Sequence, residues 1–324
     1  MDQHAVAAAD YHIPLAHARD DWRVVLRLTA DVADALRERR PVVALESSVL
    51  AQGLPIPANR EAAERMMGAV RAAGALPAIA AIIDGEATLG LTNDELERFL
   101  LREGIRKVSS RDLAPAVAQG ACGATTVAAT LALMVRSDVR VFATGGIGGV
   151  HRAPPYDESA DLVELARSPC VVVCAGAKSV LDLPATLERL ETLGVPVIGF
   201  RTSDFPAFLS SSSGLAVSAV AESAEEIAAI ERAHRRLGRR EALLVVQPPP
   251  VEWALDRAEV DAAVSDALRE AESAHVRGNQ LTPFLLRAVE RATGGRSRVT
   301  NLALLEANAH LAGAVAVALR RLEG

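Results

Sequence analysis

The sequence predicts an α/β protein, a three-layer α/β/α arrangement with a mostly parallel central sheet and a helical C-terminal region. Short β-rich runs recur, helical patterns separate them, and small or polar residues follow each run. Because the runs are continuously apolar, they are typical of parallel strands buried on both faces. The predicted strands are Val42–Leu45, Ala78–Ile83, Val141–Ala143, Val171–Cys174, Val195–Phe200 and Leu243–Val246.

The stretches between the runs have the apolar spacing of amphipathic helices. Examples are Ala62–Val70 and Leu187–Leu193, where apolar residues recur every three or four positions. From about Asp256 onward the pattern is helical throughout, including Asn301–Arg320 with its Ala and Leu spacing. No internal repeat interrupts this order.

The composition supports one large core: 50% of the 324 residues are hydrophobic and 23% are charged. Residues 1–27 carry no periodic pattern and are interpreted as an N-terminal extension. Residues 28–324 are predicted to form a single α/β/α catalytic domain.

The charge pattern argues against a nucleic-acid partner. The formal net charge is −6, and Leu237 and Gly238 interrupt the dense basic run Arg232–Arg240. A solvated helix end explains that run, since a nucleic-acid face needs more clustered positive charge.

The compartment is predicted to be the cytoplasm. Three cysteines form no disulfide framework, and the first 21 residues lack a basic segment followed by an apolar core. No uninterrupted apolar run reaches the roughly 18 residues of a membrane span, so no membrane association is expected.

Ligands in open α/β sheets gather beyond the carboxyl ends of the strands, so the residues after each run are the candidates for a site. They are unusually small and polar. They comprise Glu46–Ser48, Asp84 and Gly85, Thr144–Gly149, Ala175–Lys178 and Gln247.

Gly123–Thr126 runs into the helical pattern Val127–Val135, which places free backbone N–H groups and two hydroxyls, those of Thr125 and Thr126, at a helix N-terminus. Such an end is an anion site. The alternative is an ordinary Thr cap after a glycine turn.

The string Thr144–His151 is too glycine-rich for an incidental turn, so backbone must approach something closely there. A dinucleotide fingerprint is disfavoured, because His151 stands where a third glycine is needed and Pro154 and Pro155 stand where a helix should begin. Asp157–Asp161 then supplies three carboxylates within five residues, which suit a hard divalent cation, sugar hydroxyls or an ordinary helix N-terminus.

Lys178 ends a strand among small residues, with an apolar run behind it that would partly desolvate its amine. Desolvation lowers the pKa of a lysine, and a neutral amine can attack a carbonyl carbon. A lysine reaching out to the surface is the alternative. Glu46, at the end of another strand, would act as a general acid or base in the same pocket.

Together these segments resemble the pseudouridine-5′-phosphate glycosidase family, in order, from about Leu28 to Leu322. The resemblance rests on Ala44–Ser48, Lys107, Ser110–Leu113, Gly123–Thr130, Thr144–Arg152, Ser159–Leu162, Cys174–Ser179, Thr282–Leu286, Thr293–Gly295 and Asn301.

The resemblance implies a C-glycosidase that converts pseudouridine 5′-phosphate and water reversibly into uracil and ribose 5-phosphate. It makes Lys178 the nucleophile and Glu46 the proton donor. Asp157 matches a ligand of a divalent metal, manganese, with water completing the coordination. The family also implies a homotrimer. The implied substrate-binding residues are Lys107, Thr126, Val127, Ser159, Ala160 and Asp161, with His151 and Asn301 at further pocket positions.

A carbon–carbon glycosidic bond makes chemical sense of the lysine, because it has no heteroatom that an acid could protonate as a leaving group. An amine condensed at carbon 1 of the opened ribose gives an iminium, an electron sink from which the aromatic carbon can depart or to which it can add.

Departures from the family pattern leave a second activity open. Family members usually have two more residues between the His151–Arg152 pair and Asp157, and an Asn where Gln247 stands. The ribose phosphate machinery is intact while loops facing the base have changed. The alternative is therefore a biosynthetic C-glycosynthase that joins ribose 5-phosphate to an aromatic natural product.

Two other classes compete with this interpretation. One is a hydrolase that uses Glu46 and Asp161 as paired carboxylates on an O- or N-glycoside and needs no lysine. The other is a phosphosugar-binding module that keeps the anion site and has lost turnover.

Overall fold

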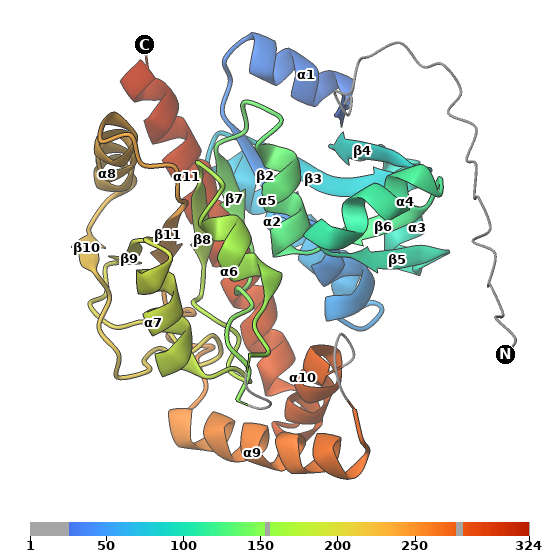
Figure 1. Cartoon of the computed structure of the whole chain (residues 1–324), viewed down its shortest axis with the longest axis vertical. Helices are drawn as coiled ribbons and strands as arrows, with labels where there is room; N and C mark the ends of the chain where they lie inside the picture. Colours follow the sequence, from blue (N-terminus) through green and yellow to red (C-terminus); the bar gives the residue numbers. More distant parts are fainter. Residues whose placement is uncertain (1–25, 153–155, 277–280, 324) are drawn as a thin grey trace, which may run out of the picture.

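The computed structural model describes residues 26–152, 156–276 and 281–323, which fold around one large mixed sheet (Figure 1). The strand order is β1-β4-β3-β2-β7-β8-β11-β9-β10, with β6 also paired to β3 and β5 paired to β6. The strands are β1 Arg27–Leu28, β2 Val42–Glu46, β3 Leu76–Ile83, β4 Glu86–Leu89, β5 Ile105–Val108, β6 Cys122–Thr125, β7 Val141–Ala143, β8 Val171–Cys174, β9 Val197–Phe200, β10 Ala219–Ala221 and β11 Leu243–Val246.

The sheet is mostly parallel, as predicted, and only the pairings of β3 with β4 and with β6 are antiparallel. All six predicted strands form. Three have the predicted bounds, and β9 begins at Val197 because Val195 and Pro196 belong to the preceding connection. The sequence did not predict β1, β4, β5, β6 and β10, which are short or polar. Since β1 begins at Arg27, the ordered fold reaches one residue into the predicted extension; residues 1–25 lie outside the described part.

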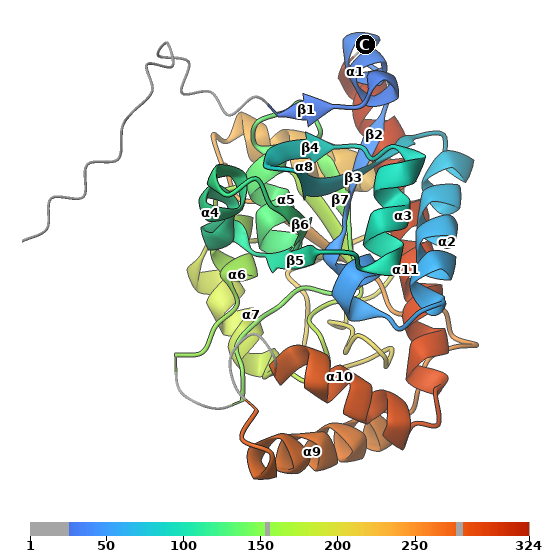
Figure 2. The same ribbon diagram turned by 90° about the vertical axis from the view of Figure 1, so that its right-hand side faces the viewer.

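Helices cover both faces of the sheet, giving three layers. On one face α11 packs on α2, on α8 and across β7 and β8, while α5 and α6 pack against each other on the opposite face (Figures 1 and 2). The helices are α1 Ala30–Arg37, α2 Ala58–Ala72, α3 Asn93–Leu101, α4 Leu113–Ala118, α5 Val127–Met134, α6 Ala160–Leu165, α7 Leu183–Thr192, α8 Ala224–Arg236, α9 Arg257–Ser273, α10 Leu281–Ala292 and α11 Arg296–Glu323, with a short π-helix η1 at Val49–Gly53 and a 3₁₀ turn η2 at Ser110–Asp112.

The longest helix, α11, is a core helix. It is long and apolar enough to cross a membrane, but 72% of its apolar window is buried inside the protein. It brings Ala and Leu side chains to the strands, and at Gly313 an added Cβ would come within 2.6 Å of the Cβ of Ala73. This close approach sets how deeply α11 lies against the rest of the fold.

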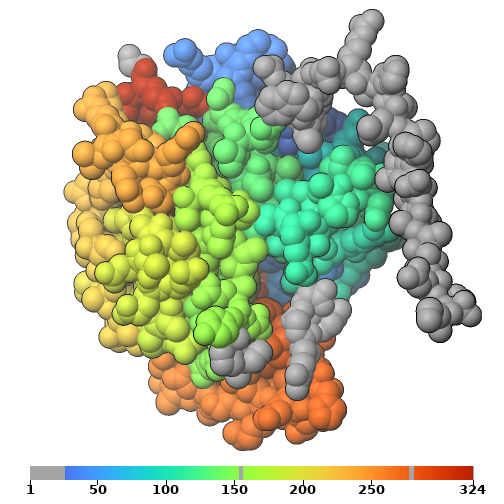
Figure 3. All heavy atoms as spheres, in the orientation of Figure 1, coloured from blue at the N-terminus to red at the C-terminus, as the bar shows by residue number. Residues whose placement is uncertain are grey.

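The carboxyl ends of the central strands meet at one edge of the sheet. Register places Glu46 beside Ala80, Ala143 beside Val173, and Val246 beside Cys174. Helices α9 and α10 lie at the end of the molecule opposite α1 (Figure 2), and in the space-filling view residues of α9 form the lower end of the body (Figure 3).

The predicted basic run is a helix end. Arg235 lies in the last turn of α8, where it donates to the carbonyl oxygens of Arg239 and Glu241 and to the Glu231 carboxylate. All three cysteines are free and buried, and burial raises the pKa of Cys174 to about 12. These thiols are structural.

Candidate functional site

Glu46 ends β2 as a buried carboxylate with both oxygens held. Its Oε1 accepts a 2.5 Å hydrogen bond from Thr144 Oγ1, and its Oε2 accepts from Ser48 Oγ. Only 7% of the residue is exposed. A carboxylate held by two hydroxyls has one fixed orientation, as a proton-transfer group requires.

Lys178 lies in a loop joined to the glycine-rich loop by backbone hydrogen bonds. Ala175 N donates to Gly145 O at 2.9 Å, Ile147 N to Gly176 O at 3.0 Å, and Lys178 N to Ile147 O at 3.1 Å. Gly176 has a φ of +83°, and an added Cβ would lie 2.3 Å from Pro206 O. The conformation that turns the chain toward Lys178 therefore requires glycine.

The whole sequence contains only two lysines, Lys107 and Lys178, among 35 lysines and arginines. Lys107 lies on β5, at the rim of the site. Loss of hydration lowers the pKa of Lys107, and the charge of Lys178 lowers it further, while Glu46 and Asp161 raise it. The structure thus brings both lysines and two predicted acids within electrostatic reach of one another.

The segment Gly123–Thr126 leads into a helix, as predicted. Thr126 caps α5 and its Oγ1 accepts from Ala129 N at 3.4 Å. Val127, the first residue of α5, has no partner for its N–H within the helix. No residue of the described part of the chain accepts from this N–H, which can therefore bind an anion beside Lys107, whose β5 pairs with β6 just before α5.

Asp161 connects two parts of the site through backbone bonds. Its Oδ1 accepts from Ala128 N at 2.9 Å and its Oδ2 from Gly148 N at 2.7 Å. Ser159 caps α6, and an added Cβ on Gly148 would lie 2.3 Å from Ser159 Oγ. Ser159, Ala160 and Asp161 therefore begin a helix, as the alternative held, and also hold the glycine-rich loop.

The predicted metal ligand Asp157 faces His151. The two side chains are joined at 2.8 Å from His151 Nδ1 to Asp157 Oδ2, and His151 N donates to Asp157 O at 2.9 Å. Among the described residues no three His, Cys, Asp or Glu side chains cluster as a metal site. One carboxylate with one oxygen engaged fits a hard cation bound mostly by water, and does not fit zinc, which takes four protein N or S ligands in structural sites.

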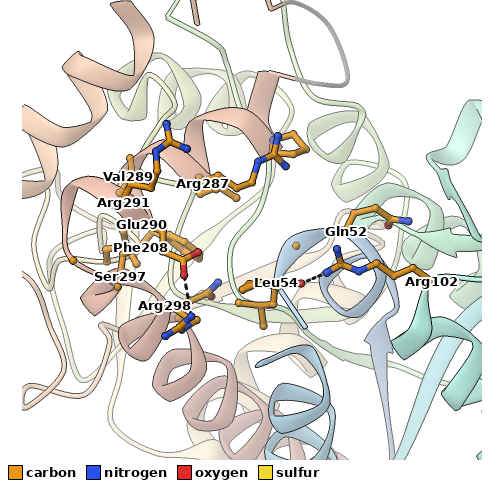
Figure 4. A pocket seen from close by; sticks show the side chains of 18 residues that line it. Gln52, Leu54, Arg102, Phe208, Arg287, Val289, Glu290, Arg291, Ser297 and Arg298 are labelled. Carbon is orange, nitrogen blue, oxygen red and sulfur yellow. Dashed lines mark hydrogen bonds and ion pairs between the residues drawn. The ribbon is translucent and has the colours of Figure 1, made fainter. Parts of the chain in front are cut away.

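Asn301 lies between the glycine-rich loop and a cavity of about 620 Å³. An added Cβ on Gly145 would lie 3.4 Å from Asn301 Oδ1, and one on Gly146 would lie 2.7 Å from the ring of Phe208. Asn301 and Phe208 both line the cavity, whereas Glu46 and Lys178 do not. Figure 4 shows Gln52 and Arg102 on one side of it and the arginines of α10 and α11 on the other. The cavity is thus a space next to the glycine-rich loop that neither Glu46 nor Lys178 lines.

The sequence analysis did not identify the residues that form hydrogen bonds to Glu46 and to the glycine-rich loop. Ser48 and Thr144 bind Glu46, and Asn308 of α11 donates to the carbonyl oxygens of Thr144 and Gly145. A hydroxyl two residues after Glu46 and another at the end of the adjacent strand were the available signals. Nothing local marked Asn308.

Comparisons with known proteins show the family of the chain. A family model described as Indigoidine synthase A like protein matches residues 31–318. The pseudouridine-5′-phosphate glycosidase of Gemmatimonas aurantiaca is 60% identical over 293 residues, which cover 90% of this chain and 96% of that protein. The pseudouridine-5′-phosphate glycosidase of Herpetosiphon aurantiacus is 51% identical, covering 91% and 98%.

Two solved structures are similar over most of the chain. The prealnumycin C-glycosynthase AlnA in complex with ribulose 5-phosphate has a TM-score of 0.85 at 39% identity, covering 92% of this chain and 98% of that one. An indigoidine synthase A-like protein from Thermotoga maritima has a TM-score of 0.82 at 39% identity, covering 87% and 94%.

Asp161→Asn should destabilise the fold by about 1–3 kcal/mol, because the amide keeps one acceptor oxygen for two backbone N–H groups. Urea unfolding measures the change. Unaltered stability would mean that the two backbone bonds contribute nothing, and that Asp161 is retained for ligand contact alone.

Proposed function

Because the chain belongs to the Indigoidine synthase A like family, whose curated relatives include pseudouridine-5′-phosphate glycosidases, we propose that it is a C-glycosidase acting at carbon 1 of ribose 5-phosphate. The proposed reaction is pseudouridine 5′-phosphate and water to uracil and ribose 5-phosphate, reversibly. Lys178 acts as nucleophile through a Schiff base and Glu46 as proton donor.

The observation that carries this proposal is that both lysines of the sequence belong to one site. The Lys178 backbone is bonded to the loop whose Thr144 holds Glu46, and the charges of Lys178 and Glu46 both act on Lys107. Arginine supplies every other basic side chain apart from histidine, and a guanidinium stays protonated and forms no Schiff base. A Schiff base therefore requires a lysine amine at this site, whereas a positive charge on the surface can be supplied by arginine.

In the cleavage direction the Lys178 amine attacks carbon 1, and the ring oxygen leaves with its bonding electrons and takes the proton that the attacking nitrogen loses. The bond between carbon 1 and the base then breaks. Its electrons go to the base carbon, which takes the proton from Glu46, while the lysine nitrogen forms the iminium. Water adds to the iminium and releases ribose 5-phosphate and the free amine.

The phosphate is proposed to bind at the N-terminus of α5, on the Val127 N–H, with Lys107 neutralising its charge and Thr126 beside it. Ser159–Asp161 hold the glycine-rich loop against the sugar. His151 and Asn301 are proposed as further substrate-binding residues of the pocket.

Paired-carboxylate hydrolysis is a poorer account of the site. Both oxygens of Asp161 accept backbone N–H bonds, at 2.9 and 2.7 Å, which gives this carboxylate a structural role in holding the glycine-rich loop to α5. A hydrolase of that kind also gives no role to Lys178.

A second candidate activity is C-glycosynthesis, favoured by the 39% identity to a prealnumycin C-glycosynthase over nearly the whole chain. An aromatic acceptor would add to the same iminium. The cavity beside Asn301, about 620 Å³, is the place for an acceptor larger than uracil.

We propose that Asp157 holds a divalent cation, manganese, with water as its other ligands. His151 fixes the carboxylate through its 2.8 Å bond. When bound, the cation supplies positive charge that attracts and orients the phosphosugar.

The chain is further proposed to be a cytoplasmic homotrimer, by likeness to its family. Light scattering should give three times the 34.1 kDa of one chain.

Borohydride added with ribose 5-phosphate should fix a mass adduct on Lys178. With two lysines in the chain, peptide mapping separates this outcome from modification of Lys107. Lys178→Arg keeps the charge and should abolish both adduct and turnover. If the wild-type protein stays unlabelled, or if Lys178→Arg still turns over, Lys178 is not the nucleophile.

Incubation with ribose 5-phosphate and either uracil or a phenolic polyketide, followed by mass spectrometry, decides between the two activities. The glycosidase assignment expects pseudouridine 5′-phosphate with uracil. Product with the phenol alone would make the chain a synthase.

A chelator should lower activity, and manganese should restore it. Independently, titration of Mn²⁺ followed by its electron paramagnetic resonance should show bound ion for the wild type and at least about tenfold weaker binding for Asp157→Asn. Equal binding by both would place the ion elsewhere.

A further inference from the structure

Asn308 is a fully buried amide in the middle of α11, with an exposed fraction of 0%. Its Nδ2 donates to Thr144 O at 2.9 Å and to Gly145 O at 3.3 Å. Its Oδ1 accepts from Gln247 Nε2 at 2.9 Å. Since buried polar groups must find partners, this amide is fixed in one orientation, with the donors toward the loop.

Each of the two carbonyl groups leads to a different reactive side chain. Thr144 is the residue whose hydroxyl donates to Glu46 Oε1 at 2.5 Å. Gly145 O also accepts from Ala175 N at 2.9 Å, in the loop that ends at Lys178. Asn308 therefore binds the backbone of Thr144 and Gly145, which is connected to both the Glu46 carboxylate and the loop that carries the Lys178 amine.

Gln247 binds the Asn308 amide from the side away from the loop. The carbonyl groups of Thr144 and Gly145 only accept, so they hold the Asn308 nitrogen toward the loop, and its oxygen accepts from Gln247 Nε2. Gln247 is itself anchored, since its N donates to Cys174 O at 3.1 Å at the end of β8.

We propose that Asn308, supported by Gln247, is a positioning residue that sets the distance between Glu46 and Lys178. The inference rests on the proposed function for its kinetic consequence. Proximity chemistry is steep, and a displacement of about 1 Å can cost on the order of 100-fold in rate.

Asn308→Asp is the first test, because it preserves shape and the Gln247 bond and removes both donors. We expect kcat to fall by about 10- to 100-fold, with KM for the phosphosugar changing less than about threefold, since Lys107 and the α5 N-terminus are untouched. Hydrogen exchange should rise in peptides covering residues 144–150 and 174–181.

Gln247→Glu is the second test and does not alter Asn308. A carboxylate at residue 247 has no donor for the Asn308 oxygen and competes with the two loop carbonyl groups for the Asn308 nitrogen. The same loss of kcat and the same rise in exchange should follow. This variant decides the matter if Asn308→Asp fails to fold.

Glu231→Gln is the matched control, another exchange of an acid and its amide at a buried residue with an exposed fraction of 1%. Glu231 accepts from Arg140 and Arg235, and Arg140 immediately precedes β7, at the edge of the sheet away from the site. It should lower the melting temperature while leaving kcat per folded molecule and exchange in the two loops unchanged.

The inference is overturned if Asn308→Asp or Gln247→Glu keeps kcat within twofold, or if exchange in the two loops rises no more than in Glu231→Gln. Hydrogen exchange needs no substrate and so decides the inference even if the wild type never turns over. That last outcome would remove the proposed function alone.

Discussion

The pairing of β7 with β8 continues beyond the ends of both strands, and the site depends on that continuation. Thr144 N donates to Val173 O, Ala175 N to Gly145 O, Ile147 N to Gly176 O and Lys178 N to Ile147 O. Lys178 is therefore carried by sheet-like backbone although it follows the strand.

Close approach between these loops is possible only because side chains are missing. An added Cβ on Gly146 would meet Phe208 at 2.7 Å, and one on Gly148 would meet Ser159 Oγ at 2.3 Å. The glycine-rich string thus serves packing against protein, where a dinucleotide fingerprint would serve packing against a pyrophosphate. Its glycines also explain how α11 comes near enough for Asn308 to bind two of its carbonyl groups.

Lysine and arginine occupy different places in this chain. Arginine forms the surface ion pairs, for example Arg60 with Glu97 and Arg257 with Asp261. Such exposed pairs contribute little stability, typically below about 1 kcal/mol. Lysine occurs only at the site, where loss of hydration and the second ammonium lower the pKa of Lys107. A lysine amine can lose its proton, whereas an arginine guanidinium stays protonated.

The sequence by itself determined the parallel core, since continuously apolar runs have no other stable place, and it located Glu46, Thr126 and Lys178 through their positions after strands or before a helix. The short outer strands escaped prediction because pairing, and not composition, makes residues such as Arg106 and Lys107 a strand. Only the tertiary structure assigned Asp161 to two backbone N–H groups and brought Thr144, Gln247 and Asn308 to the loops. Those partners lie up to 164 residues apart, and no local pattern encodes a hydrogen bond that exists only after the sheet and α11 have packed.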